Sequence, residues 1–332
     1  MTLEQNIRIK SRPNIVILGD YEKAIRRFSN WDALEQRANL TIHHQPLRDE
    51  ALFEVIKDAD AIAIVRDRAP LNKALLDRLK KLKFLMFTGE RNGTLEATAL
   101  VERNIPIACS PGGPSKETTA ELTWTLILGA SKRLLEQNQL MVQGGWRDQL
   151  SVLPMLNGER LGIIGLGAIG SRVARVGQAF GMELVTWSPH MTAERAAAEN
   201  AKSVSLDELL STAKVVSLHL VASPDTKGLI NAEKLALMRA DSILVNTSRS
   251  SLITMQALPA ALVAGHPGQA AIDVFDLEPL PADDLLRKTP NLLVTPHLGF
   301  IAEPIFATFA NGITQTLMAW LDNKPLPHPF KP

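Results

Sequence analysis

Three segments in the last third of the chain place a side chain suited to acid–base or anion chemistry after an apolar run. Arg249 lies in VNTSRS, Glu278 in AIDVFDLEP and His297 in VTPHLG. Arginine binds a carboxylate through a rigid fork of donors, histidine exchanges a proton near neutral pH, and a neighbouring carboxylate favours the protonated histidine. Alone, each could be a surface cation, a solvated carboxylate or a residue at the start of a helix. Together they are the groups that hydride transfer to a carbonyl requires.

A glycine-rich turn lies upstream of these segments. Gly165 ends the apolar run LGIIG, and Gly167 and Gly170 follow it, with Ala168 and Ile169 between them, before the helical pattern SRVARVGQAFG. In this spacing the first glycine permits a tight turn, the second lets backbone approach a pyrophosphate, and the third lets the helix pack on the strand. The helix N-terminus then faces negative charge. The strand before and the helix after favour a dinucleotide site over a glycine-rich packing turn.

The residue at the ribose position of such a unit is not an acid. Ser188 stands eighteen residues past Gly170, where an Asp or Glu would bind the ribose of NAD and repel the 2′-phosphate of NADP. Ser188 can donate to a phosphate oxygen, and His190 or Arg195 can reach the same group. We therefore predict NADP(H) rather than NAD(H). The alternative is that Ser188 only ends a strand while backbone groups hold the ribose of NAD.

The elements that must position these residues alternate between strand and helix along the whole chain. Five short β-branched or apolar runs lie in the first 110 residues, with helical periodicity between them: NIVILGD, LTIHH, DAIAIVRD, KFLMFTG and IPIAC. A second series of strands is expected at 161–165, 184–187, 215–218, 243–246, 270–274 and 291–295. One long helix is expected from Lys116 to the glycine pair at 144–145, and another over 303–322. Strands alternating with helices predict an α/β fold with two doubly wound parallel sheets.

Composition excludes several classes of function. The 332 residues are 45% hydrophobic and carry a formal charge of +1, without a basic run that would follow nucleic-acid phosphates. The N-terminus lacks a signal-peptide pattern and no 18 apolar residues run uninterrupted, so we expect a soluble cytoplasmic protein without a membrane or nucleic-acid partner. The single cysteine, Cys109, cannot form an internal disulfide and has no partner at metal-ligand spacing. We expect no metal site.

The motifs together resemble the D-isomer-specific 2-hydroxyacid dehydrogenase family. The resemblance covers nearly the whole chain and rests on GLGAIG, LHLVASPDTKGLI, LVNTSRSSLI, AIDVFDLEPLP and NLLVTPHLG, in the family's order and spacing. It implies reduction of a 2-oxo acid to the D-2-hydroxy acid with a nicotinamide cofactor. The pocket residues Phe300 and Ile301, with no phosphate-binding cluster beyond Arg66 and Arg68, favour a small unphosphorylated substrate such as hydroxypyruvate or glyoxylate.

The resemblance also implies roles for single residues. Arg249 would bind the substrate carboxylate and 2-oxygen, His297 would be the acid–base catalyst, and Glu278 would orient it and raise its pKa. Asp273 would contact the nicotinamide end of the cofactor. The full cofactor set is Gly165, Gly167, Ala168, Ile169, Gly170, Ser188, His190, Thr247 and Asp273. FTGERNGTLE resembles the family's substrate-carboxylate loop.

That loop assigns Gly89 and Glu90 to the substrate, and VRDRAP adds Arg66, which could equally be a helix-capping or surface residue. Two positions depart from the family: Ser250-Ser251 stands where Gly-Pro is usual, and Ala168 replaces a common arginine.

The implied domains are a flavodoxin-like substrate domain, residues 1–107 plus 296–332, and a Rossmann nucleotide domain, residues 108–295, which commonly dimerises in the family. The same family contains nucleotide-sensing corepressors, so a binding protein of that kind is the alternative to an enzyme.

Overall fold

Short apolar runs become the strands of two separate parallel sheets. A computed structural model describes residues 12–147 and 152–332. The described chain forms two units: residues up to Pro114 together with Ala302–Pro332, and Ser115–Ile301. The expected α/β class with two parallel sheets is confirmed.

The two divisions fall later in the chain than the sequence indicates, at 114/115 and 301/302 instead of 107/108 and 295/296. At the first division, Ser110 N–H still donates to Phe87 of the first sheet. At the second, the backbone N–H groups of Leu298 and Gly299 donate to Asp273. His297 therefore belongs to the second unit, not to the first as predicted.

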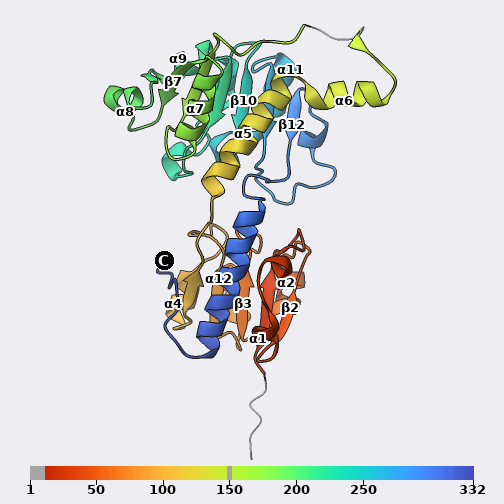
Figure 1. The fold of residues 1–332 in the computed structure, drawn as a ribbon, viewed down its shortest axis with the longest axis vertical. Helices are drawn as coiled ribbons and strands as arrows, with labels where there is room; N and C mark the ends of the chain where they lie inside the picture. Colours follow the sequence, from red (N-terminus) through yellow and green to blue (C-terminus); the bar gives the residue numbers. More distant parts are fainter. Residues whose placement is uncertain (1–11, 148–151) are drawn as a thin grey trace, which may run out of the picture. The chain divides into compact units, whose positions relative to one another are not determined.

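The first unit is a five-stranded sheet of order β2-β1-β3-β4-β5, the flavodoxin-like order. Its strands are β1 (Asn14–Leu18), β2 (Asn39–Ile42), β3 (Ala61–Ile64), β4 (Phe84–Phe87) and β5 (Ile107–Cys109). Its helices are η1 (Ile25–Phe28), α1 (Asp32–Glu35), α2 (Asp49–Ile56), α3 (Lys73–Arg78), α4 (Thr98–Glu102) and α12 (Glu303–Leu321). β3 and β4 are buried along their whole length because helices cover both faces. The C-terminal helix α12 packs on β4 and η1, and is the blue helix of Figure 1.

The second unit is a seven-stranded parallel sheet of order β12-β11-β10-β9-β6-β7-β8. Its strands are β6 (Arg160–Ile164), β7 (Glu183–Trp187), β8 (Lys202–Ser203), β9 (Val215–Leu218), β10 (Ile243–Asn246), β11 (Gln269–Ile272) and β12 (Leu292–Val294). Its α-helices are α5 (Ser115–Ser131), α6 (Leu134–Val142), α7 (Gly170–Ala179), α8 (Ala193–Ala197), α9 (Leu206–Thr212), α10 (Ala232–Ala236) and α11 (Leu258–Ala264). Its 3-10 helices are η3 (Pro224–Thr226), η4 (Ser250–Leu252), η5 (Met255–Ala257) and η6 (Leu285–Lys288). The sequence predicted six of the strands and missed β8, which is too short to show a period.

Alternate residues of each central strand fill two different cores. In β10, Ile243 and Val245 join the core under α5 and α7, whereas Leu244 joins the core under α9, α10 and α11. Figure 1 shows α5 and α7 side by side over one face of this sheet. A strand buried on both faces must be apolar at every position, which is why these strands read as continuous apolar runs.

The long helix predicted from Lys116 is in fact two helices. α5 ends at Ser131 and α6 begins at Leu134, with Arg133 between them at φ 48°. A left-handed residue cannot continue a right-handed helix, so the direction of the chain changes there. No residue of α6 is buried.

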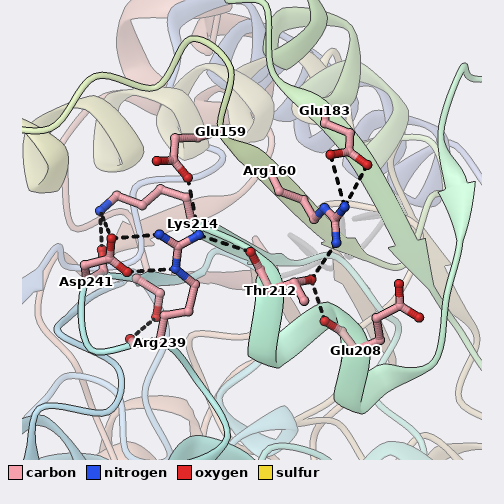
Figure 2. A network of polar contacts seen from close by, with 9 residues as sticks. Glu159, Arg160, Glu183, Glu208, Thr212, Lys214, Arg239 and Asp241 are labelled. Carbon is pink, nitrogen blue, oxygen red and sulfur yellow. Dashed lines mark hydrogen bonds and ion pairs between the residues drawn. The ribbon is translucent and has the colours of Figure 1, made fainter.

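A network of charged side chains lies at the amino ends of the strands in the second unit (Figure 2). Lys214, which precedes β9, is only 5% exposed, and its Nζ donates to the carbonyl (2.6 Å) and carboxylate (2.9 Å) oxygens of Asp241. Arg239 donates to both carboxylate oxygens of Asp241 at 2.8 Å. Nearby, Arg160 donates to both carboxylate oxygens of Glu183 at 2.9 and 3.1 Å. Asp241 therefore accepts hydrogen bonds from two cations, one of them buried.

We predict that Asp241→Asn destabilises the protein in a pH-dependent way. The hydrogen bond from Arg239, opposed by desolvation and reinforced by Lys214, lowers the pKa of Asp241 from 3.8 to about 2. A lowered pKa in the folded state contributes stability above pH 3.8 that is lost as the pH falls through about 2. At neutral pH the variant should lose about 1–3 kcal/mol, the cost of leaving a buried charge under-compensated.

Thermal and urea unfolding from pH 7 down to pH 2 measure this difference. Asp207→Asn is the matched control, because Asp207 is exposed to a similar extent (59% against 53%) but pairs with the more exposed Lys234. Its effect should stay below about 1 kcal/mol. Equal losses for the two variants would contradict a special role for Asp241.

Candidate functional site

The glycine turn joins β6 to α7 at the point where the strand order of the second sheet reverses. β6 pairs with β7 on one side and β9 on the other. The later strands β9 to β12 therefore extend the sheet on the opposite side of β6 from β7 and β8. Such a switch point is where open α/β sheets bind ligands. Gly165 has φ 99°, and a Cβ there would lie 2.8–2.9 Å from the backbone of His219 and Leu220. Only glycine fits this position.

The other two glycines have different surroundings. A Cβ on Gly170 would clash with the carbonyl oxygen of Gly165, whereas a Cβ on Gly167 would have nothing within 4 Å. The space beside Gly167 is thus open, as the predicted approach of a pyrophosphate to the backbone requires. Ala168 and Ile169 complete the turn, and the Ala168 carbonyl accepts from Arg172 Nη1 at 2.6 Å.

At the end of the neighbouring strand β7, Ser188 is half-buried and Pro189 and His190 are exposed. Thr192 caps the short helix α8 by accepting from Arg195 N–H, and Arg195 Nη1 donates to the carbonyl oxygen of His190 at 2.7 Å. These contacts hold the Arg195 guanidinium against the backbone of His190, two residues after Ser188. The roles of Ser188 and His190 at the cofactor stay predictions.

Arg249, Glu278 and His297 follow three adjacent strands, β10, β11 and β12. The Nδ1 atom of His297 lies 2.6 Å from Oε2 of Glu278, and Oε1 of Glu278 accepts from Phe275 N–H at 2.9 Å. Burial raises the pKa of Glu278, but the hydrogen bond and charge of His297, the Phe275 N–H and the charge of Arg249 outweigh it, so its pKa is lowered. Glu278 is therefore an ionised partner for the histidine. Arg249 is exposed, and its Nη1 donates to the carbonyl of Ser248 at 2.8 Å.

Asp273 holds the loop that carries His297. The Asp273 side chain is fully buried, and Oδ1 accepts from Thr295 Oγ1 (2.6 Å) and Leu298 N–H (2.7 Å), while Oδ2 accepts from Gly299 N–H (2.9 Å). Burial raises the pKa of Asp273, and these hydrogen bonds offset part of the rise. His297 lies between two of these contacts with φ 55°, in the left-handed region that non-glycine residues rarely adopt. The nicotinamide contact expected for Asp273 stays a prediction.

The substrate residues predicted in the first unit lie together at the carboxyl ends of β3 and β4. Arg66 has φ 57°, and its backbone N–H donates to Thr88 Oγ1 at 3.0 Å. Its guanidinium lies against Gly89, where a Cβ would overlap it. Glu90 is exposed, and its charge, after burial, helps to raise the pKa of the Cys109 thiol.

Three polar residues of this region, Thr119, Thr123 and His219, were not predicted. Thr247, predicted for the cofactor, lies 2.8 Å from Thr123 on α5, measured between the hydroxyl oxygens, and Thr119 of the same helix donates to Gly299 O at 2.9 Å. His219, beside the glycine turn, lies 2.8 Å from Ser217 Oγ, and burial lowers its pKa to about 3, so it is neutral. The histidine could have been found from the motif LHLVASPDTKGLI, but threonines inside a helix carry no sequence signal of their own.

Neither a metal cluster nor a membrane span is found in the described residues. Within 12–147 and 152–332, no three His, Cys, Asp or Glu side chains are grouped so as to hold a metal ion. Over the same ranges, none of the helices combines the length and apolar character needed to cross a bilayer.

Comparison with known proteins gives one consistent result. The sequence model of the "D-isomer specific 2-hydroxyacid dehydrogenase, NAD binding domain" matches residues 124–299. The glyoxylate reductase of Aeropyrum pernix is 31% identical over 293 residues, which cover 86% of this chain and 87% of the relative. The crystal structure of phosphoglycerate oxidoreductase from Vibrio cholerae O395 is 32% identical, with a TM-score of 0.82, and the match covers 91% of this chain and 98% of that one.

A second group of relatives is longer. The D-3-phosphoglycerate dehydrogenase of Methanocaldococcus jannaschii is 34% identical over 258 residues, which are 77% of this chain and 49% of the relative. The chain thus spans about half the length of that protein.

We predict that Gly167→Ala separates ligand binding from folding. Because its Cβ enters open space, the variant should melt like the wild type, but the added methyl group stands where a pyrophosphate would meet the backbone. Titration with NADH and NADPH, followed by fluorescence, should show binding at least about tenfold weaker, a loss of about 1.4 kcal/mol.

The comparison variant is Gly170→Ala, whose Cβ would clash with Gly165 O and should lower the melting temperature of the second unit. If Gly167→Ala bound both cofactors as tightly as the wild type, the glycine turn would not be the pyrophosphate site.

Proposed function

Because the chain belongs to the D-isomer-specific 2-hydroxyacid dehydrogenase family, we propose that it is an enzyme that reduces a small 2-oxo acid to the D-2-hydroxy acid with a nicotinamide cofactor. The observation that carries this proposal is the 2.6 Å contact between His297 Nδ1 and an ionised Glu278, with the charge of Arg249 close enough to act on that carboxylate. His297 and Glu278 form an acid–base pair, and Arg249 is a cation that can bind an anion. All three follow strands of the same sheet that carries the glycine turn.

The roles in the reaction follow from the chemistry of each group. The bound cofactor would supply the hydride from its nicotinamide. The turn Gly165–Gly170 would hold its pyrophosphate, Asp273 would contact its nicotinamide end, and Thr247 would be a further cofactor contact. Because Nδ1 of His297 faces Glu278, Nε2 is the atom that donates a proton to the substrate 2-oxygen as negative charge develops there. Glu278 stabilises the charged imidazolium, and Arg249 binds the substrate carboxylate and the same oxygen.

The two units divide these tasks. We assign nucleotide binding to Ser115–Ile301, which includes the residues matched by the NAD-binding model, 124–299. We assign Arg66, Gly89 and Glu90 of the first unit to the substrate, since the Arg66 guanidinium lies against Gly89 and Glu90 is exposed.

The substrate is assigned to the hydroxypyruvate or glyoxylate type. Phe300 packs edge-on to His297 at 5.6 Å between ring centroids, so the acid–base residue has an apolar neighbour on one side. The A. pernix relative, of which the match covers 87%, is named a glyoxylate reductase. Turnover measured with glyoxylate, hydroxypyruvate, pyruvate and phosphohydroxypyruvate tests this choice, and a preference for the phosphorylated acid would reject it. Cofactor binding without turnover of any 2-oxo acid would favour a corepressor-like protein.

We predict that His297→Gln lowers kcat for 2-oxo acid reduction by about 10²–10⁴-fold, the usual contribution of general acid–base catalysis. The dissociation constant of the cofactor should change little, because the side chain acts on the substrate oxygen. Stopped-flow measurement of nicotinamide absorbance gives kcat, and calorimetry gives the dissociation constant.

His328→Gln, at an exposed position in the first unit, is the control and should keep wild-type kcat. A His297 variant with near-normal turnover would remove the histidine from the mechanism.

The cofactor is assigned as NADP(H) in preference to NAD(H). Ser188 provides a hydroxyl and no negative charge at the end of β7, and the Arg195 guanidinium is bound to the carbonyl of His190, two residues further on. We predict that Ser188→Asp shifts the ratio of kcat/KM for NADPH and NADH towards NADH, since it adds a ribose acceptor and repels a 2′-phosphate. A charge-assisted hydrogen bond of about 1.5–3 kcal/mol corresponds to roughly 10- to 150-fold in this ratio.

Ser188→Ala controls for loss of the hydroxyl alone, and Arg195→Ala should weaken NADPH but not NADH. A wild-type preference for NADH above about tenfold would show that backbone groups hold the ribose of NAD, as in the alternative.

A homodimer is the proposed assembly. Several large apolar side chains of α6 and the segment after it are exposed in the single chain: Leu134, Leu135, Met141, Val142, Trp146, Val152 and Met155. Leu135 also lines a cavity of about 290 Å³ between the α5–α6 junction and the start of β11 and β12. Apolar patches of this kind mark protein contacts, and a second copy is the partner that the family offers. Light scattering gives the mass in solution, and a monomer would reject the assignment.

A further inference from the structure

The inner face of α5 carries hydroxyl groups that contact two separate loops of the proposed site. Thr119 and Thr123 are four residues apart, hence on one face of the helix. The hydroxyl of Thr123 lies 2.8 Å from that of Thr247, after β10, while Thr119 Oγ1 donates to Gly299 O, after β12, at 2.9 Å. Thr123 is fully buried and Thr119 is half-buried. One helix thus contacts the loops on both sides of Asp273.

Gly299 is held from two directions. Its N–H donates to Asp273 Oδ2 at 2.9 Å, and its carbonyl accepts from Thr119 Oγ1 at 2.9 Å. The nearest neighbours of a Cβ on Gly299 would be the Asp273 carboxylate and the Thr119 side chain, at 3.4–3.6 Å. After His297, the Asp273 carboxylate therefore binds the N–H groups of the chain, and the Thr119 hydroxyl binds the Gly299 carbonyl.

Other contacts of this segment act at different atoms: the His297 N–H donates to Thr295 O at 3.0 Å, and the imidazole lies 2.6 Å from Glu278. His297 has φ 55°, a backbone state that costs free energy for a non-glycine residue and persists only when its surroundings impose it. The side chains of His297 and Leu298 are both partly or fully exposed, so packing alone does not fix them. The hydrogen bonds to Asp273 and from Thr119 are the ones that fix the peptide groups of Leu298 and Gly299, directly after His297.

We propose that Thr119 is a positioning residue for His297: its hydroxyl fixes the Gly299 peptide and thereby the direction in which the imidazole is presented. The proposal rests on the proposed function for its kinetic consequence, but the positioning itself concerns only contacts within the second unit. Thr119 touches neither cofactor nor substrate in this assignment.

The same helix offers a matched control. The Thr119 hydroxyl has one proton and shares it between Gly299 O and Ser115 O, which lies 2.7 Å away and one turn back. The hydroxyl of exposed Thr125 donates to Glu121 O, also one turn back, at 2.9 Å. Thr119→Val and Thr125→Val both remove a hydroxyl and a bond to the preceding turn, with the same change in shape. Only Thr119→Val removes a bond to the His297 segment.

The experiment compares the wild type with Thr119→Val, Thr119→Ser and Thr125→Val. In Thr119→Val, kcat for 2-oxo acid reduction should fall roughly 3- to 10-fold, about the contribution of one hydrogen bond, while KM for the cofactor stays within twofold. Thr119→Ser should restore kcat and Thr125→Val should keep it. Equal kcat in the two valine variants, or loss of kcat that serine does not restore, would overturn the proposal.

A second readout does not depend on activity. The proton between His297 Nδ1 and Glu278 should give an NMR signal in the uncomplexed protein that disappears in His297→Gln. In Thr119→Val this signal should broaden through faster exchange with water, and in Thr125→Val it should not. An unchanged signal in Thr119→Val would overturn the positioning role even in an active enzyme. If the signal broadened in Thr119→Val but the wild type turned over no 2-oxo acid, the positioning role would be supported and the proposed function rejected.

Discussion

The buried carboxylate of Asp273 is the constraint on which the site depends. A carboxylate accepts hydrogen bonds and cannot donate them, so three converging donors from Thr295, Leu298 and Gly299 define where the chain must go after β12. Burial in a low-dielectric interior strengthens each of these bonds and makes an unpaired oxygen costly. The segment with His297 consequently stays with the second sheet, although the chain passes only a few residues later into the first unit.

The two edges of the second sheet perform different tasks. At the amino edge, the cations Arg239 and buried Lys214 are paired with the carboxylates of Asp241 and Glu159. At the carboxyl edge, Arg249 and His297 keep exposed or half-exposed polar atoms, and glycine replaces side chains in the turn after β6. In parallel sheets all strands end on the same side, so residues far apart in sequence meet there without any special long-range pairing. Charge is compensated at one edge and left available at the other.

Sequence reasoning recovers what depends on local pattern and misses what depends on tertiary contact. The strands, the glycine turn and the position of Arg249, Glu278 and His297 after strands all follow from apolar runs and spacing. The break at Arg133 does not, because apolar periodicity continues on both sides of it and a left-handed arginine has no sequence signature. The boundary after 295 was misplaced for a related reason: the bonds from Leu298 and Gly299 to Asp273 join residues 25 and 26 positions apart. Thr119 was missed because a threonine inside a helix usually bonds to the preceding turn, and only the fold shows that it also contacts Gly299.

Asp273 and Glu278, five residues apart, show how surroundings assign different roles to the same functional group. Burial dominates at Asp273 and raises its pKa, and all its hydrogen bonds come from the loop, so it acts by fixing backbone. Glu278 is also partly buried, but the imidazole of His297 and the charge of Arg249 more than offset that burial and lower its pKa. It therefore remains charged over the range in which a histidine gains and loses a proton. Asp273 thus fixes the backbone on either side of His297, while Glu278 presents an ionised oxygen to Nδ1 of its imidazole. The two acids need different surroundings, because burial that strengthens a hydrogen bond also disfavours the negative charge of a carboxylate.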